Sequence, residues 1–149
     1  MKALENYSKD FALLLEAGFI AINQMEEASA LHLFGAAEEL QPDSYLPKLG
    51  YGMIHLHKLD LNKAIKYFQQ ILKKEPNNET AKIFMALAYS LTKDNKAKSA
   101  KIIEETKNAT DPLVKDLAST MSEFIAAHNK KASTPFEMLT KPKKTAKQG

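Results

Sequence analysis

Residues 46–78, LPKLGYGMIHLHKLDLNKAIKYFQQILKKEPNN, decide the fold class of this chain. Apolar side chains recur every three or four positions on both sides of a short polar joint, which predicts two helices. Gly52 in the first helix and Ala64 in the second are small, and Phe68 and Pro76 follow them. Because proline lacks a backbone N–H and does not fit a helix interior, Pro76 marks the end of the second helix. This stretch therefore predicts a helical hairpin with small residues at its closest contact.

The same pattern recurs along the chain at a fixed interval. Gly18, Gly52 and Ala86 are 34 positions apart, and Phe34 precedes Phe68 by the same interval. In the third copy we expect two inserted residues around 92–95, which puts Glu104 in the place of the aromatic. A period of this length is typical of proteins built from stacked helix pairs. The small and aromatic positions that we expect to pack within and between the copies are Gly18, Ala30, Phe34, Gly52, Ala64, Phe68, Ala86 and Ala100.

The whole chain is accordingly predicted to be all-α. Helices are expected at 9–24, 27–40, 45–58, 61–74, 79–92, 96–108 and 112–128, with repeats at about 11–42, 45–78 and 79–112. The last helix has an apolar stripe suited to covering the open end of a helical array, formed by Leu113, Leu117, Met121, Phe124 and Ile125. The helical domain is expected to span 1–128, and residues 129–149 are expected to form a flexible basic tail.

Composition narrows the possible functions. The 149 residues are 44% hydrophobic and 26% charged, as in ordinary globular proteins, and the absence of cysteine excludes disulfide scaffolds and thiol chemistry. All 21 basic residues are lysine, and six of them against one glutamate give the tail a net charge of +5. The rest of the chain has a net charge of −2, which argues against a nucleic-acid-binding domain. The longest nearly apolar stretch is too short to cross a bilayer, and no secretion signal begins the sequence, so we expect a cytoplasmic protein without membrane insertion.

The histidines and acidic residues do not form a catalytic or metal-binding pattern. His55 and His57 are two positions apart, so on a helix their side chains point in nearly opposite directions, while His32 and His128 are isolated. No glycine-rich phosphate loop occurs, and the adjacent glutamate pairs have no evident shared cleft. We therefore expect no enzymatic activity, no cofactor and no metal.

A second apolar stripe on the first helix of each copy suggests a binding role. The stripe that packs each helix pair is already provided by other residues, whereas a surface helix normally has polar residues opposite its apolar face. The extra apolar side chains predict a concave hydrophobic groove for an amphipathic helix of a partner, or, alternatively, tighter packing within a curled array. The predicted groove residues are Leu15, Phe19, Ile22, Leu46, Leu49, Met53, Leu56, Ile83, Leu87 and Leu91.

The repeat period, the small residues and the closing prolines resemble the tetratricopeptide repeat over residues 11–128. This resemblance implies three helix pairs in a short right-handed solenoid, with a capping helix at 112–128. Three such repeats with an apolar groove are similar to the cytoplasmic chaperones of bacterial type III secretion. The segment from Asp111 to Glu123 resembles the terminal helix of the class that binds the needle subunit.

Membership in the needle-subunit class would imply a client and a second partner. The client would be a secreted subunit whose amphipathic helix lies in the groove, so that it does not polymerise before export. The second partner would be a small helical co-chaperone that supports the groove. The translocator-class chaperones and a general tetratricopeptide scaffold for protein–protein interaction remain the alternatives.

Overall fold

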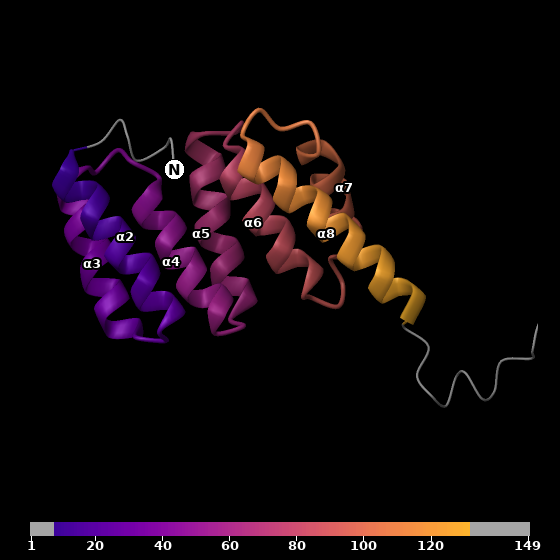
Figure 1. Cartoon of the computed structure of the whole chain (residues 1–149), viewed down its shortest axis with the longest axis horizontal. Helices are drawn as coiled ribbons and strands as arrows, with labels where there is room; N and C mark the ends of the chain where they lie inside the picture. The colour runs from indigo at the N-terminus through magenta and orange to yellow at the C-terminus, as the bar shows by residue number, and fades with distance from the viewer. Residues whose placement is uncertain (1–7, 132–149) are drawn as a thin grey trace, which may run out of the picture.

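The computed structural model describes residues 8–131, with the side chains described as far as Ala127. This part of the chain is all-helical and contains no strand. Each of the seven helices lies where the sequence predicted one, with ends that differ by three residues at most (Figure 1). The helices are α2 (Lys9–Asn23), α3 (Glu27–Leu40), α4 (Leu46–His57), α5 (Leu61–Lys74), α6 (Glu79–Ser90), α7 (Lys96–Thr106) and α8 (Pro112–Lys131).

Polar side chains at the helix starts explain several of these boundaries. The first N–H groups of a helix have no partner within the helix, so a preceding Ser, Asn or Asp stabilises them. Ser8 accepts a hydrogen bond from the Phe11 N–H at 3.3 Å, and Asn78 accepts one from the Ala81 N–H at 2.9 Å. Asp111 accepts one from the Leu113 N–H at 2.9 Å. The starts of α2, α6 and α8 are therefore determined by local sequence.

The helices pack in chain order, each on the next, from α2 to α8. We refer to α2–α3, α4–α5 and α6–α7 as the first, second and third pairs. α3 packs on α4 and α5 packs on α6, which joins the pairs, and α2 also touches α4 directly. Figure 1 shows the first pair at one end of the array and α8 lying across α6 and α7 at the other.

Aromatic rings seated on glycines hold the first two pairs together. Phe34 and Phe68 are fully buried. A Cβ atom built on Gly18 would lie 2.7 Å from the Phe34 ring, and one on Gly52 would lie 2.5 Å from the Phe68 ring. Gly50, on the next pair, would bring a Cβ within 2.5 Å of Phe34 as well. Glycine is thus required at these positions for close approach and not for an unusual backbone angle.

The third pair departs from the predicted register. Ala100 is exposed, as is Glu104, whereas Ser99, Ile103 and Thr106 are buried. These three residues lie 35 positions after Ala64, Phe68 and Ile71, so one residue has been inserted rather than two. The Ser99 hydroxyl donates to the Ala86 carbonyl at 2.7 Å, which satisfies a polar group where the other pairs have alanine.

The capping stripe on α8 is partly the one predicted, since Met121 is buried in the cluster with α6 and α7, and Leu117 and Ile125 pack against that cluster. Val114, Ala118 and Met121 are buried against α6 and α7, while Leu113 and Phe124 are 61% and 68% exposed. The predicted tail falls almost wholly in residues 132–149, outside the described part of the chain. No helix in residues 8–131 is long and apolar enough to cross a membrane.

Candidate partner-binding surface

Three half-buried apolar side chains recur at the same position of α2, α4 and α6. Phe19, Met53 and Leu87 are 34 positions apart, and each follows directly the small residue that packs its pair. All three lie against the buried core without being enclosed by it. The Phe19 ring packs edge-on against Phe34 with centroids 5.1 Å apart, so its position is tied to the core. These three residues define what we call the repeated apolar row.

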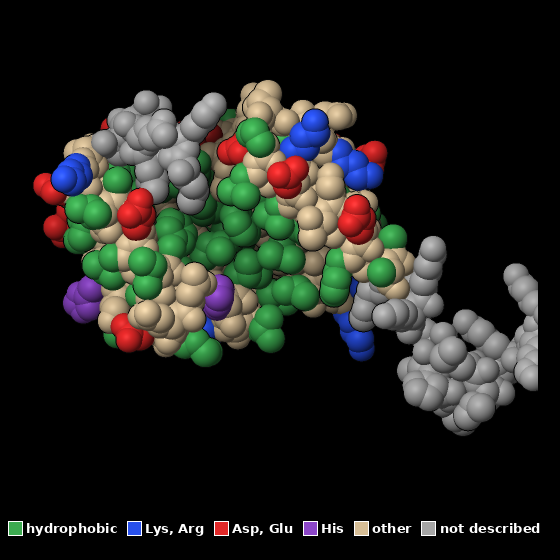
Figure 2. All heavy atoms as spheres, in the orientation of Figure 1, with side chains coloured by type: hydrophobic (Ala, Val, Ile, Leu, Met, Phe, Trp, Pro, Cys, Tyr) green, Lys and Arg blue, Asp and Glu red, His purple; other side chains and the backbone are tan. Residues whose placement is uncertain are grey.

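A second position, four residues further along the chain at the end of each helix or directly after it, is exposed. It is occupied by Asn23, His57 and Leu91, and Leu91 is 51% exposed. Residues four apart on a helix lie on the same side, so each helix presents one half-buried and one exposed side chain there. Figure 2 shows hydrophobic side chains spread over the middle of one face of the molecule, between α2 and α8.

Most of the predicted groove is core rather than surface. Six of its ten residues are between 0% and 7% exposed, namely Leu15, Ile22, Leu46, Leu49, Leu56 and Ile83. The first five belong to the main core, because α2 and α4 touch each other directly and leave little open space between them. Ile83 is enclosed in the cluster formed with α8. The accessible part of the prediction is the repeated apolar row and Leu91.

A carboxylate on α6 holds the start of α8. Glu79 accepts hydrogen bonds from the backbone N–H groups of Thr110, at 3.0 Å, and Asp111, at 3.2 Å. The Thr110 hydroxyl also lies 3.2 Å from the carboxylate. Hydrogen bonds to the charged form, led by that from the Thr110 backbone, lower the pKa of Glu79 below its ordinary value of 4.5. The sequence analysis missed this contact, since Glu79 stands 31 positions from Thr110 and no local pattern joins them.

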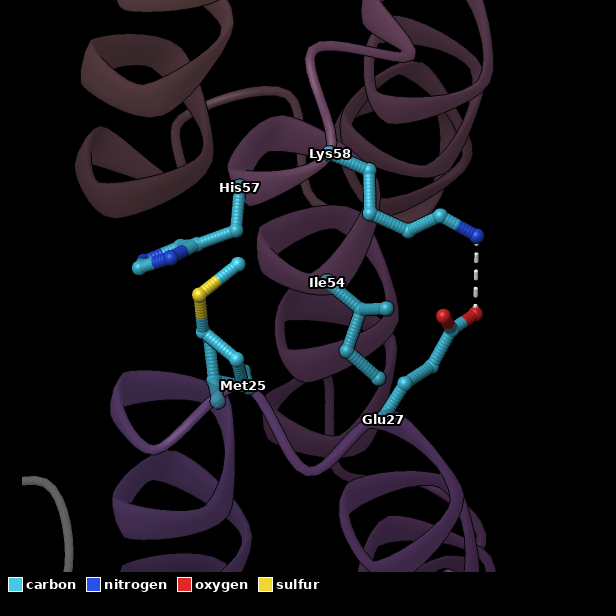
Figure 3. Close-up of a pocket in the computed structure, with 6 residues that line it drawn as sticks. Met25, Glu27, Ile54, His57 and Lys58 are labelled. Carbon is cyan, nitrogen blue, oxygen red and sulfur yellow. Dashed lines mark hydrogen bonds and ion pairs between the residues drawn. The ribbon is translucent and has the colours of Figure 1, made fainter.

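A shallow hollow of about 130 Å³ lies where the turn after α2 meets the end of α4. Ile22, Met25, Ile54 and His57 line it, and the Lys58 ammonium pairs with a Glu27 carboxylate oxygen at 3.0 Å on its rim (Figure 3). Surface ion pairs of this kind contribute little to stability, so the hollow is held mainly by apolar packing.

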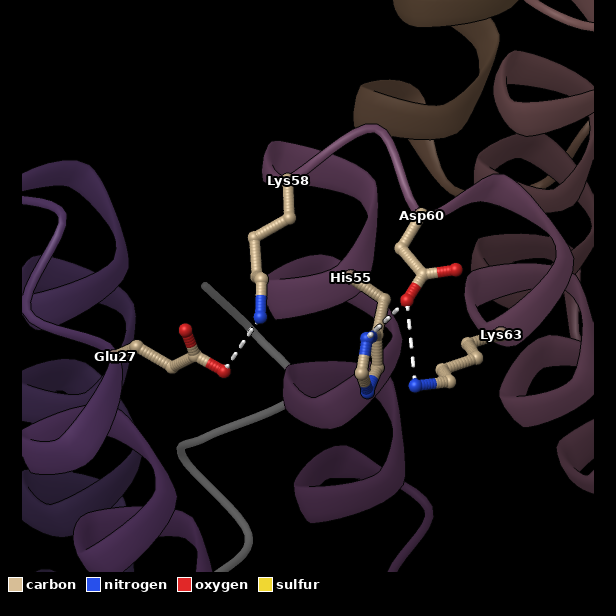
Figure 4. A network of polar contacts seen from close by, with 5 residues as sticks. All are labelled: Glu27, His55, Lys58, Asp60 and Lys63. Atoms are coloured by element: carbon tan, nitrogen blue, oxygen red, sulfur yellow. Dashed lines mark hydrogen bonds and ion pairs between the residues drawn. The ribbon is translucent and has the colours of Figure 1, made fainter.

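The polar contacts next to this hollow involve a histidine, an aspartate and a lysine. His55 stacks on Tyr67, and its Nδ1 lies 3.6 Å from Asp60 Oδ2, beyond hydrogen-bond distance (Figure 4). The same carboxylate oxygen lies 3.5 Å from Lys63 Nζ. Among the described residues, no three His, Asp or Glu side chains come together as metal ligands would. His32 and His57 are exposed, and the side chain of His128 is outside the described part.

Comparisons with protein-family models, curated proteins and solved structures gave no match for this chain.

Proposed function

We propose that this protein is a helix-binding adaptor or chaperone of the tetratricopeptide type. In this proposal the three helix pairs form a short right-handed solenoid, and an amphipathic helix of a client lies along the repeated apolar row. The observation that carries the proposal is the recurrence of Phe19, Met53 and Leu87 at one register position on three helices, all apolar and all still accessible. A surface made of equivalent side chains at regular intervals suits a ligand that is itself regular, such as a helix.

The packing of α8 supports this choice of ligand. α8 lies on α6 and α7 through Val114, Ala118 and Met121, which are four and three residues apart and so form one stripe. The array therefore already accepts an amphipathic helix at its end. A client helix beside α8 would extend the same kind of contact toward α2.

The expected affinity follows from how much surface remains to be buried. Complete burial of one large apolar side chain contributes about 1.5–3 kcal/mol, so a half-buried one adds about 1 kcal/mol. Phe19, Met53 and Leu87 together thus add about 3 kcal/mol, and the client's own apolar face supplies the larger share. This favours clients with a long and strongly amphipathic helix.

The resemblance to type III secretion chaperones makes a needle subunit the first client to test, with a small helical co-chaperone as second partner. A translocator-class chaperone or a general scaffold would use the same surface for another peptide. A clamp for a C-terminal carboxylate is disfavoured, because the repeated apolar row and the positions four residues after it carry no lysine and are apolar apart from Asn23 and His57. We propose the bacterial cytoplasm as its location and no catalytic role.

The decisive variant is Met53→Glu in the full chain, purified from the cells that make it, with bound proteins identified by mass spectrometry. A carboxylate in the centre of the row would have to lose water against an apolar helix, so the client should be lost. Leu113→Glu is the matched control, since Leu113 is an exposed apolar residue of α8 outside the row.

Circular dichroism should show that both variants remain folded. If Met53→Glu unfolds the chain, the row belongs to the core and the proposal fails. It fails equally if the folded variant keeps every partner of the parent protein.

A further inference from the structure

The outer side of the first pair exposes apolar residues at positions that are buried in the second pair. Residues 34 apart can be compared directly, because the first two pairs share one register. Three positions of the first pair are 53%, 56% and 43% exposed, whereas their counterparts are under 2%, 4% and 8% exposed. The positions are Leu13 with Pro47, Ile20 with Ile54, and Leu31 with Ile65.

A covering helix accounts for this difference. α3 packs on α4 and covers the second pair, and α5 packs on α6 in the same way. At the corresponding positions of α6, Ala81 and Ala88 are fully buried too, whereas Ala100, the counterpart of Ile65 on α7, is exposed. In residues 8–131, no helix precedes α2, and Figure 1 shows the first pair at the end of the array. The uncovered positions therefore have the size and spacing that elsewhere receive a helix of 14 residues, the length of both α3 and α5.

Gly35 on α3 lies beside Leu31 on the same outer side of the first pair. A Cβ atom on Gly35 would meet only the Tyr51 hydroxyl oxygen, at 3.9 Å, so no described neighbour requires a glycine there. Glycine within a helix costs about 0.5–1 kcal/mol relative to alanine. Gly35 and Leu31 line one shallow hollow together with His32, Ala36 and Glu39. A glycine at this place allows another backbone to approach closely.

Charge indicates what kind of helix would fit. Residues 9–40 contain one lysine and six acidic residues, a net charge of −5, whereas residues 41–78 have six lysines and three acidic residues, a net of +3. Exposed Glu16 lies between Leu13 and Ile20 at helical spacing, so it belongs to the same side of α2. Two copies of so acidic a helix pair would repel each other, while a basic helix would be attracted.

We propose that the outer face of α2 and α3, centred on Leu13, Ile20 and Leu31, docks a basic amphipathic helix of a partner protein. The partner's apolar stripe takes the place that α3 and α5 have on the other pairs, and a lysine or arginine lies opposite Glu16. This face is separate from the repeated apolar row, so it leaves that row open to a client.

A synthetic peptide with the sequence of α5, LNKAIKYFQQILKK, is the probe. It has four lysines and no acidic residue, and in this protein the same segment covers α6. Fluorescence anisotropy with the labelled peptide and the full chain should show binding that weakens as salt is added. Ile20→Asp should weaken binding about tenfold or more, because it places a carboxylate under the apolar stripe. Glu16→Lys should weaken it as well, through like-charge repulsion.

Two controls locate the binding. Leu113→Asp, on α8, and Leu59→Asp, in the turn after α4, replace exposed apolar residues outside both surfaces and should bind the peptide as the parent does. The proposal is overturned if the peptide does not bind, or if either control loses binding as Ile20→Asp does. It is also overturned if the full chain sediments as a dimer that Ile20→Asp converts to a monomer, or if the peptide binds only after residues 1–7 are deleted. A second copy or the chain's own N-terminal segment would then cover this face.

Discussion

The contact between the first two helix pairs and the contact between the second and third pairs are built differently. Phe34 reaches across to the second pair and is seated on Gly50. Phe68 reaches across to the third pair and there meets another ring, that of Phe84, with centroids 6.3 Å apart. Gly50 and Phe84 are 34 positions apart and so occupy the same place in the register. At Gly50 the Phe34 ring lies directly against the α4 backbone, with the Tyr51 ring edge-on at 6.1 Å, whereas at the equivalent position the Phe84 side chain itself stacks on Phe68.

Within the third pair the packing is also less apolar. Ile103 replaces the aromatic residue, and Ser99 replaces alanine and bonds to the Ala86 carbonyl. α8 then covers this pair and is held at its start by Glu79. The two halves of the array are therefore stabilised differently: the first by Phe rings packed against glycines, and the second by a polar contact and an added helix.

The largest expected effect is that of Phe68→Ala, which removes a fully buried ring at the centre of the array. The transfer and cavity terms together should lower the free energy of unfolding by about 3–5 kcal/mol. Ile103→Ala in the third pair leaves a smaller cavity and should cost about 2–3 kcal/mol. Urea denaturation of both variants measures the two losses in the free energy of unfolding. A greater loss in Ile103→Ala than in Phe68→Ala would show that the third pair depends more on its buried side chain than the first two pairs do on theirs.

A matched pair of glycine substitutions tests whether packing or backbone freedom selects glycine. Gly52→Ala places a Cβ 2.5 Å from the Phe68 ring, and overpacking should destabilise the protein by about 1–3 kcal/mol. Gly35→Ala has open space and should stabilise it by about 0.5–1 kcal/mol through higher helix propensity. Thermal melting should show a lowered melting temperature for Gly52→Ala and a raised one for Gly35→Ala. An unchanged melting temperature in Gly52→Ala would mean that the close packing of the Phe68 ring against Gly52 is not needed for stability.

The attachment of α8 should depend on pH through Glu79. Its pKa is lowered in the folded state, so its stabilising contribution is complete above the unfolded value near 4.5 and is lost as the pH falls through the lower folded value. Amide hydrogen exchange should show α8 losing protection in this acidic range before α2 to α5 do.

The control for this pH effect is Glu79→Gln, which cannot ionise. It should lower the free energy that holds α8 in place by at most about 1 kcal/mol at neutral pH, since Glu79 is partly exposed and its interactions are screened by solvent. Its α8 protection should also be less sensitive to acid than that of the parent. An identical acid response in both proteins would assign the pH dependence to other carboxylates.

The smallest expected effect concerns two turns with the same unusual backbone. Met25 and Leu59 are 34 positions apart, have φ of 61° and 58°, and are 84% and 68% exposed. Left-handed backbone favours glycine, so Met25→Gly and Leu59→Gly should each raise stability by about 0.5–1 kcal/mol. Leu13→Gly, at an exposed site inside α2, should lower it by about 1 kcal/mol instead. A loss of stability in the turn variants would show that these side chains contribute packing.

The site was less predictable than the fold, and Leu15 and Ile83 illustrate why. A second apolar stripe on a helix has the same pattern whether it faces a ligand or a neighbouring helix of the same chain. The sequence contained no information on how closely α2 approaches α4, or on the α8 residues that would cover Ile83. The stripe on α8 was only partly predicted for a related reason, since Val114–Ala118–Met121 and Leu113–Leu117–Met121 are both helical spacings.

Sequence alone determined what depends on near neighbours in the chain. Apolar periodicity, the closing proline Pro76 and the regular recurrence of Gly18 and Gly52 located the helices and two of the three glycines that contact the buried Phe rings. Only the tertiary structure decided which apolar residues stay accessible, that Ser99 rather than Ala100 packs in the third pair, and that Glu79 holds α8. The physical reason is that burial and long-range hydrogen bonds depend on the distance between helices. That distance is set by all the side chains between them together, and no local pattern specifies it.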